Sequence, residues 1–119
     1  MKYRPFSDLG WKVSEIGLGC WQIGWCWGDV SEKDSRALLK EALNQGINFF
    51  DTSDMYGDGR SEKFIGELIK STREKIYVTT KLGRRTRGTS YNKGFKEQYM
   101  EEFVDRSLKN LGIECLDLV

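Results

Sequence analysis

Apolar residues recur at helical spacing in three stretches of the chain. The first stretch runs from an expected helix cap at Ser31 to Gly46, and the second begins at an expected cap at Ser61. The third is expected to cover residues 97–110 and to end at Gly112. Since residues four positions apart share a helix face, each helix is expected to bury one side. The apolar residues on these faces are Leu38, Leu39, Ala42, Leu43, Phe64, Ile65, Leu68, Ile69, Val104, Leu108 and Leu111.

Short apolar runs between these helices predict strands. Four runs, at residues 16–19, 47–50, 76–80 and 115–119, are expected to form one sheet. Two further runs, at residues 3–6 and 13–16, flank turn-forming residues and predict a small hairpin. Strands that alternate with amphipathic helices indicate parallel strands joined by right-handed crossovers. The predicted fold class is therefore α/β, with four parallel strands, three helices and an N-terminal β-hairpin.

Two architectures share this alternation, an open doubly wound sheet and a closed (β/α)₈ barrel. The doubly wound sheet is disfavoured by the stretch GLGCWQIGWCWG at residues 17–28, because a dinucleotide fingerprint needs glycine where Gln22 stands. Four strands cannot close a barrel, which takes eight strands and about 250 residues. We therefore expect one unit that forms the N-terminal half of a TIM barrel. Residues 1–15 are its hairpin cap, and residues 16–119 are its βαβαβαβ portion.

Composition narrows the classes of partner. The chain has 119 residues, of which 39% are hydrophobic and 31% are charged, as in globular proteins that fold in water. Its formal net charge of +1 gives no reason to expect nucleic acid or a membrane as partner. The N-terminal residues lack the apolar core of a signal peptide, so a cytoplasmic location is expected. With no histidine and only three scattered cysteines, no metal site is expected.

Three polar residues fall where predicted strands give way to loops. Asp51 directly follows the strand at 47–50, Tyr56 lies in the loop after it, and Lys81 directly follows the strand at 76–80. Because neighbouring parallel strands end at the same edge of a sheet, these side chains are expected to converge. Taken singly, each is also an ordinary turn, loop or surface residue.

Together, a carboxylate, a phenol and an ammonium group predict a proton-transfer site. A phenol has a pKa near 10 and is a poor acid at neutral pH, but a neighbouring cation favours the phenolate. A carboxylate would hold that cation charged and oriented. With a hydride donor opposite, the reaction at such a site would be carbonyl reduction or alcohol oxidation.

Around these residues the sequence resembles the aldo/keto reductase family, in its bacterial-type branch. The resemblance is carried by GINFFDTSDMYGDGRSEKFIGELIK at residues 46–70 and by YVTTKLG at residues 77–83. The opening YRPFSDLGWKVSEIGLGCWQIG and the closing VDRSLKNLGIECLDLV also resemble family segments, in family order. The resemblance implies an NADP-dependent oxidoreductase that reduces aldehydes or ketones to alcohols.

The resemblance also implies roles for individual residues. Tyr56 would be the general acid/base, Lys81 would make it a stronger acid, and Asp51 would pair with Lys81. NADP(H) would be bound at Gly19, Cys20, Trp21 and Asp51. The substrate would be a small-molecule carbonyl compound. Trp25 and Trp27 would line the substrate mouth or pack over the loop, two readings that the sequence leaves open. Arg84, Arg85 and Arg87 could face an anionic group, but a solvated basic loop is favoured.

The sequence departs from the family pattern at its end. Family members complete the site with a histidine just after the fourth strand, and this chain ends at Val119 without it. The chain is then an N-terminal part of a working enzyme, a half-barrel completed by a second copy or another chain, or a degenerate binding or scaffold protein. In each case we expect self-association or a missing C-terminal half, and little reductase activity from residues 1–119 alone. The alternative function is a non-catalytic nucleotide-sensing or interaction module, like the channel-regulatory subunits related to this family.

Overall fold

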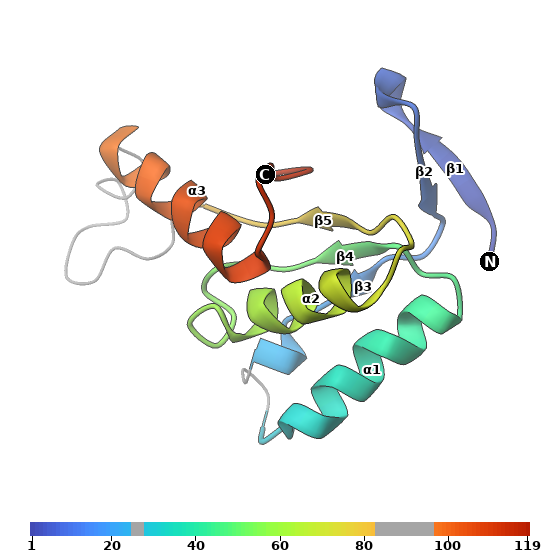
Figure 1. Ribbon diagram of the computed structural model, residues 1–119, viewed down its shortest axis with the longest axis horizontal. Coiled ribbons are helices and arrows are strands. Elements are labelled where there is room, and N and C mark those ends of the chain that lie inside the picture. Colours follow the sequence, from blue (N-terminus) through green and yellow to red (C-terminus); the bar gives the residue numbers. More distant parts are fainter. Residues whose placement is uncertain (25–27, 83–96) are drawn as a thin grey trace.

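The computed structural model describes residues 1–24, 28–82 and 97–119 (Figure 1). The loop expected at residues 82–96 lies almost wholly outside the described residues, as do Trp25, Trp27, Arg84, Arg85 and Arg87. The strands are β1 (Tyr3–Phe6), β2 (Trp11–Ser14), β3 (Leu18–Gly19), β4 (Phe49–Asp51) and β5 (Tyr77–Thr79). The helices are α1 (Glu32–Asn44), α2 (Arg60–Ser71) and α3 (Glu97–Leu111), with 3₁₀ turns at Ser7–Leu9 and Gln22–Gly24. None of the helices described is both long and apolar enough to cross a membrane.

The predicted hairpin is present, although its second strand begins two residues earlier than expected. β1 and β2 are antiparallel, with Tyr3 opposite Ser14 and Phe6 opposite Trp11. The connecting turn ends at Gly10, whose φ of 70° is in the left-handed region that glycine adopts at little cost. This tight turn brings Trp11 directly into register with Phe6, which fixes the start of β2.

The main sheet is parallel and follows the order β3-β4-β5. All three strands are shorter than the predicted runs, and Asp51 is the last residue of β4 rather than the residue after it. The fourth strand, expected at residues 115–119, is reduced to a parallel bridge between Leu118 and Thr79. The amide of Thr80 also donates to the carbonyl of Leu118 at 3.1 Å, so this segment continues the sheet beside β5.

The two faces of the sheet have different covers. Phe50 of β4 and Val78 of β5 are paired in register and belong to the buried core beneath α1 and α2. Phe49 and Tyr77 point to the opposite face, since side chains alternate along a strand. The hairpin covers them there, because Trp11 stacks on Tyr77 with ring centroids 4.8 Å apart. The hairpin thus closes the end of the sheet where the strands begin (Figure 1).

Helix α1 begins as predicted. The hydroxyl of Ser31 accepts a hydrogen bond from the amide of Asp34 at 3.0 Å, and the chain leaves the helix through Gly46 at a φ of 84°. The expected buried face is too wide, however, because Leu38 is 45% exposed. Leu39 and Leu43 already fill the stripe that faces the sheet.

The prediction that Ser61 caps α2 is wrong. The cap is Gly59, with a φ of 86°, and Ser61 is a buried residue of the first helical turn. The buried face of α3 agrees with the predicted one only at Leu111: Phe103 and Ser107 are also buried, whereas Val104 and Leu108 are half-buried. Helix α3 packs against α2, and Gly112 at a φ of 66° ends it as expected.

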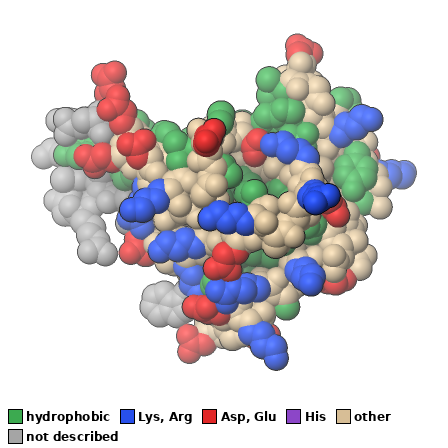
Figure 2. All heavy atoms as spheres, in the orientation of Figure 1, with side chains coloured by type: hydrophobic (Ala, Val, Ile, Leu, Met, Phe, Trp, Pro, Cys, Tyr) green, Lys and Arg blue, Asp and Glu red, His purple; other side chains and the backbone are tan. Residues whose placement is uncertain are grey.

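Charged side chains of both signs are interspersed over the face shown in Figure 2. Arg36 of α1, for example, donates to Glu32 in its own helix and to Glu67 of α2, at 2.8 and 2.7 Å. The Arg36 bonds hold the pKa of the Glu67 carboxyl below its ordinary value. Because these groups are solvent-exposed, such pairs contribute little to stability.

Candidate active site

The ends of β4 and β5 bring Asp51 and Lys81 together. The ammonium group of Lys81 donates to Asp51 Oδ1 at 2.6 Å and to the carbonyl oxygen of Thr52 at 2.8 Å. Both side chains remain nearly half exposed, at 44% for Lys81 and 45% for Asp51. An ion pair this exposed contributes little to stability, so its main consequence is a fixed position for the Lys81 ammonium.

Tyr56 completes the predicted trio. Its ring centroid lies 5.1 Å from the Lys81 ammonium, within the range of a cation–π contact. The same ring is stacked with Trp21, with centroids 5.7 Å apart and planes 9° from parallel. Carboxylate, ammonium and phenol therefore lie in one cluster, as the strand-end argument predicts.

The loop that carries Tyr56 is held by two glycines that sequence reasoning missed. A Cβ on Gly24 would lie 2.6 Å from the carbonyl carbon and the Cβ of Tyr56, so only glycine fits there. Gly57 has a φ of 62°, and a Cβ added to it would collide with the carbonyl group of Gly24. The available signal was the glycine directly after Tyr56, because glycine in a loop often marks a positive φ or a close approach of two backbone segments.

The residues expected to bind the cofactor differ in their exposure to solvent. Gly19 and Trp21 are exposed, and a Cβ on Gly19 would meet nothing within 4 Å. Cys20 is 1% exposed, and its thiol donates to the carbonyl of Leu18 at 3.4 Å. Burial, reinforced by the Asp51 carboxylate, raises the pKa of the Cys20 thiol to about 12, against the opposing effect of Lys81. The Cys20 side chain is thus a neutral, internal group behind the site.

A buried polar layer directly beneath the site is a second feature that the sequence analysis left out. Thr52, Ser61, Glu62 and Thr80 are each at most 2% exposed, and they are linked by hydrogen bonds through their side chains. The signal was present in the Ser-Glu pair at the start of the second helix, which directly precedes the apolar face expected from Phe64 onward. The preference of serine for helix starts assigned Ser61 to a cap, and periodicity gave Glu62 no role.

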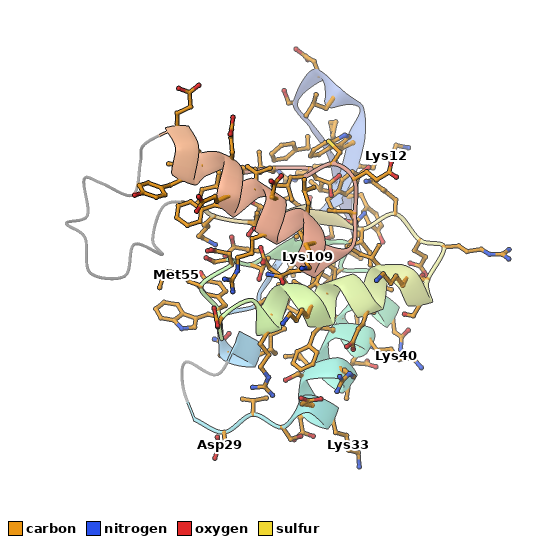
Figure 3. All side chains as sticks on the ribbon, turned by 60° about the vertical axis from the view of Figure 1, so that its left-hand side comes forward. Lys12, Asp29, Lys33, Lys40, Met55 and Lys109 are labelled. Atoms are coloured by element: carbon orange, nitrogen blue, oxygen red, sulfur yellow. The ribbon has the colours of Figure 1, made fainter. Side chains whose placement is uncertain are left out.

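The cluster lies at the end of the sheet opposite the hairpin. Figure 3 shows Met55, from the loop that carries Tyr56, and Lys12, from β2, on opposite sides of the fold. Met55 is 38% exposed and Trp21 is 45% exposed, so the stacked Trp21–Tyr56 pair has an apolar exposed surround. Such a surround favours a ligand with a flat or apolar part beside the polar trio.

Comparison with known proteins places the chain in a family. A model of the aldo/keto reductase family matches residues 15–119. Aldo-keto reductase YhdN of Bacillus subtilis is 36% identical over 99% of this chain, and the match covers 37% of that protein. The NADP(+)-designated aldo-keto reductase yakc of Schizosaccharomyces pombe is 38% identical over 89% of this chain and 32% of its own length.

Comparison with solved structures also points to the aldo/keto reductase family. The holo form of aldo-keto reductase AKR11C1 from Bacillus halodurans superposes with a TM-score of 0.77 and 31% identity, over 98% of this chain and 38% of that one. The chain belongs to the aldo/keto reductase family, and its α/β fold superposes on part of an aldo-keto reductase structure. It spans between 32% and 38% of the length of these relatives.

Proposed function

We propose that these residues form the proton-transfer part of an NADP-dependent oxidoreductase that reduces aldehydes or ketones to alcohols. The observation that carries the proposal is the Lys81–Asp51 contact of 2.6 Å, with the same ammonium 5.1 Å from the Tyr56 ring centroid. Family membership supports the reaction class, and the designation of the yeast relative supports NADP as cofactor.

The exposed part of the site suits a nicotinamide cofactor. Trp21 offers an exposed aromatic side chain, and Gly19 leaves the strand end uncrowded. Asp51 is half exposed, and its carboxylate has acceptor capacity beyond the bond to Lys81. These residues fit a ribose hydroxyl and a flat ring, and Cys20 contributes packing behind them. When bound, NADPH supplies the hydride that reduces the carbonyl carbon.

The residues of this chain handle the proton. The hydroxyl of Tyr56 donates a hydrogen bond to the carbonyl oxygen and transfers its proton to that oxygen as negative charge develops there. Lys81 stabilises the resulting phenolate, and Asp51 keeps the ammonium in place. Solvent then returns a proton to Tyr56, which restores the site. In the reverse direction the same phenolate accepts the proton of an alcohol.

The test is a single substitution in the full-length natural protein. Tyr56→Phe removes the transferable proton and keeps the ring stacked on Trp21, so kcat for an aldehyde such as 4-nitrobenzaldehyde is expected to fall by roughly 10²-fold or more. NADPH binding, measured by fluorescence titration, should stay within twofold. The matched control is Tyr3→Phe, which alters an exposed tyrosine of the hairpin at the other end of the sheet.

Three results would count against the proposal. Oxidation of NADPH that survives Tyr56→Phe would remove the assigned acid. NADPH binding without turnover of any carbonyl compound would favour the alternative, a nucleotide-sensing module. Strong reductase activity from residues 1–119 alone would contradict the expectation that the cofactor needs contacts beyond this chain, which spans 37% of a matched relative.

A further inference from the structure

Two consecutive residues in the first turn of α2 are polar and completely buried. Ser61 and Glu62 each have 0% exposure, and they directly follow Arg60, the half-buried first residue of α2. A buried carboxylate costs several kcal/mol unless hydrogen bonds compensate it. Both groups that donate to Glu62 are neutral: the hydroxyl of Thr80 at 2.7 Å and the amide of Asn110 at 2.8 Å.

The hydrogen bonds of this pair reach three different strand ends. Ser61 donates to the carbonyl oxygen of Cys20 at 3.1 Å and shares a hydrogen bond with the hydroxyl of Thr52 at 2.8 Å. Glu62 holds Thr80 after β5 and, through Asn110, the last turn of α3. One helical turn therefore fixes the ends of all three strands of the sheet.

Each strand-end residue in this network is the sequence neighbour of a site residue. Cys20 precedes Trp21, Thr52 follows Asp51, and Thr80 precedes Lys81. Along extended chain, neighbouring side chains point to opposite sides. The side chains of Thr52 and Thr80 therefore bond to the Ser61–Glu62 pair beneath the site, while those of Asp51 and Lys81 project into the site above. At Cys20 the bond is to the backbone carbonyl, directly before Trp21.

We propose that Ser61 and Glu62 are positioning residues, which set the Lys81 ammonium and the Trp21 ring against Tyr56 through the strand ends. This inference rests on the proposed reductase function. The backbone amide of Ser61 donates to the carbonyl oxygen of Tyr56 at 3.2 Å, whereas the side chains of Ser61 and Glu62 bond to the strand-end partners and act through them. Small errors of placement in such a site cost activity steeply, about 10²-fold for 1 Å.

The mildest test breaks one bond of the network. Thr80→Val keeps the shape of the side chain and removes the hydroxyl that Glu62 accepts from. In the full-length protein we expect kcat, counted per NADPH-binding molecule, to fall by roughly tenfold, with the dissociation constant for NADPH within twofold. The matched control is Thr72→Val at the exposed end of α2, where the hydroxyl bonds only the amide of Glu74, and kcat should not change.

A double-mutant cycle separates positioning from general destabilisation. If Thr80 acts through Lys81, the effect of Thr80→Val on kcat should shrink to within twofold in a Lys81→Met background, because there is no ammonium left to misplace. A structural role alone would lower the folded fraction equally in both backgrounds. Equal losses in both, or no loss in the first, would overturn the inference.

Glu62→Met gives a second variant, which replaces the buried carboxylate by an apolar group of similar size, with Glu67→Met as its exposed control on the same helix. A readout that needs no turnover is the NMR signal of the Lys81 ε-methylene group. It should move in Thr80→Val and Glu62→Met and stay in place in the two controls. A wild-type protein without reductase activity would refute the proposed function, whereas an unmoved Lys81 signal would refute the positioning role.

Discussion

At the scale of single residues, Cys20 shows how closely a protonated group is packed behind the site. The side chain is 1% exposed, and burial with the Asp51 carboxylate raises its thiol pKa from 9.0 to about 12. The thiolate is the reactive form, so native Cys20 should resist iodoacetamide at pH 8. Exposed Cys115 should be alkylated under the same conditions, and both should react in denaturant, which mass spectrometry of digests would report. Modification of Cys20 as fast as Cys115 would contradict the packing.

The raised pKa of Cys20 also sets the sign of a pH effect on stability. Above pH 9.0 the unfolded chain releases the thiol proton, while the folded chain keeps it up to about pH 12. The unfolded state is then favoured, so the free energy of unfolding should fall as pH rises through this window. Cys20→Ala removes this contribution. Urea unfolding at pH 8 and pH 10 should therefore show a smaller alkaline loss in Cys20→Ala than in the parent, and equal losses would show that Cys20 does not titrate this way.

How much of the site could be predicted from sequence follows from what each residue does. Asp51, Tyr56 and Lys81 were predictable because strand ends in a parallel sheet share one edge, and the structure brings the three together. The need for glycine at position 24 was not predictable, because the atoms that leave no room for a side chain belong to Tyr56, which is distant along the chain. Glu62 was hidden for a similar reason: its partners lie 18 and 48 residues away, and no local pattern encodes them.

At the scale of elements, the contact between α2 and α3 depends on one glycine. A Cβ on Gly66 would lie 2.5 Å from the carbonyl oxygen of Leu111 and 2.9 Å from that of Asn110. In an isolated helix, alanine in place of glycine stabilises by about 1 kcal/mol. At Gly66 the cost of overpacking, about 1–3 kcal/mol, should exceed this gain, because the clashing atoms belong to the backbone and cannot move without displacing α3.

Gly66→Ala is therefore expected to lower the free energy of unfolding by about 1–2 kcal/mol in urea titrations followed by circular dichroism. The control is Gly19→Ala, at a strand end where the added methyl group meets nothing within 4 Å. We expect this control to unfold within about 0.5 kcal/mol of the parent. A Gly66→Ala protein more stable than the parent would show that α3 can move away from α2.

The elements themselves were predicted unevenly, and the reason is physical. Helices α1 and α3 follow from four-residue spacing, with a glycine after each end. The start of α2 was misassigned, since serine at a helix start is usually a cap, and the tertiary bonds of Ser61 override that preference. The segment at residues 115–119 has the composition of a strand, but only Leu118 pairs with β5. Pairing depends on both neighbours of a strand, which composition does not report.

At the scale of the whole molecule, the fold is flattened and less compact than a single domain of the same length. Its extents are 43 × 39 × 21 Å, and its radius of gyration is 14.6 Å, against about 13.5 Å expected for a compact domain of this length. The helices cover one face of the sheet and the hairpin covers only part of the other (Figure 1). β3 at one side and the segment around Leu118 at the other are the edges of the described sheet.

Unpaired strand edges are templates for pairing with another chain, so residues 1–119 on their own should self-associate through them. Size-exclusion chromatography with light scattering should then report masses above that of the 13.8 kDa chain, increasing with concentration. Val119→Lys places a charge at one edge, next to Leu118, and should weaken association several-fold. Leu38→Lys is the matched control, because Leu38 is an exposed apolar residue on helix α1 and not on a strand of the sheet. A monomer at all concentrations would refute edge pairing, and equal weakening by both variants would point to apolar patches instead.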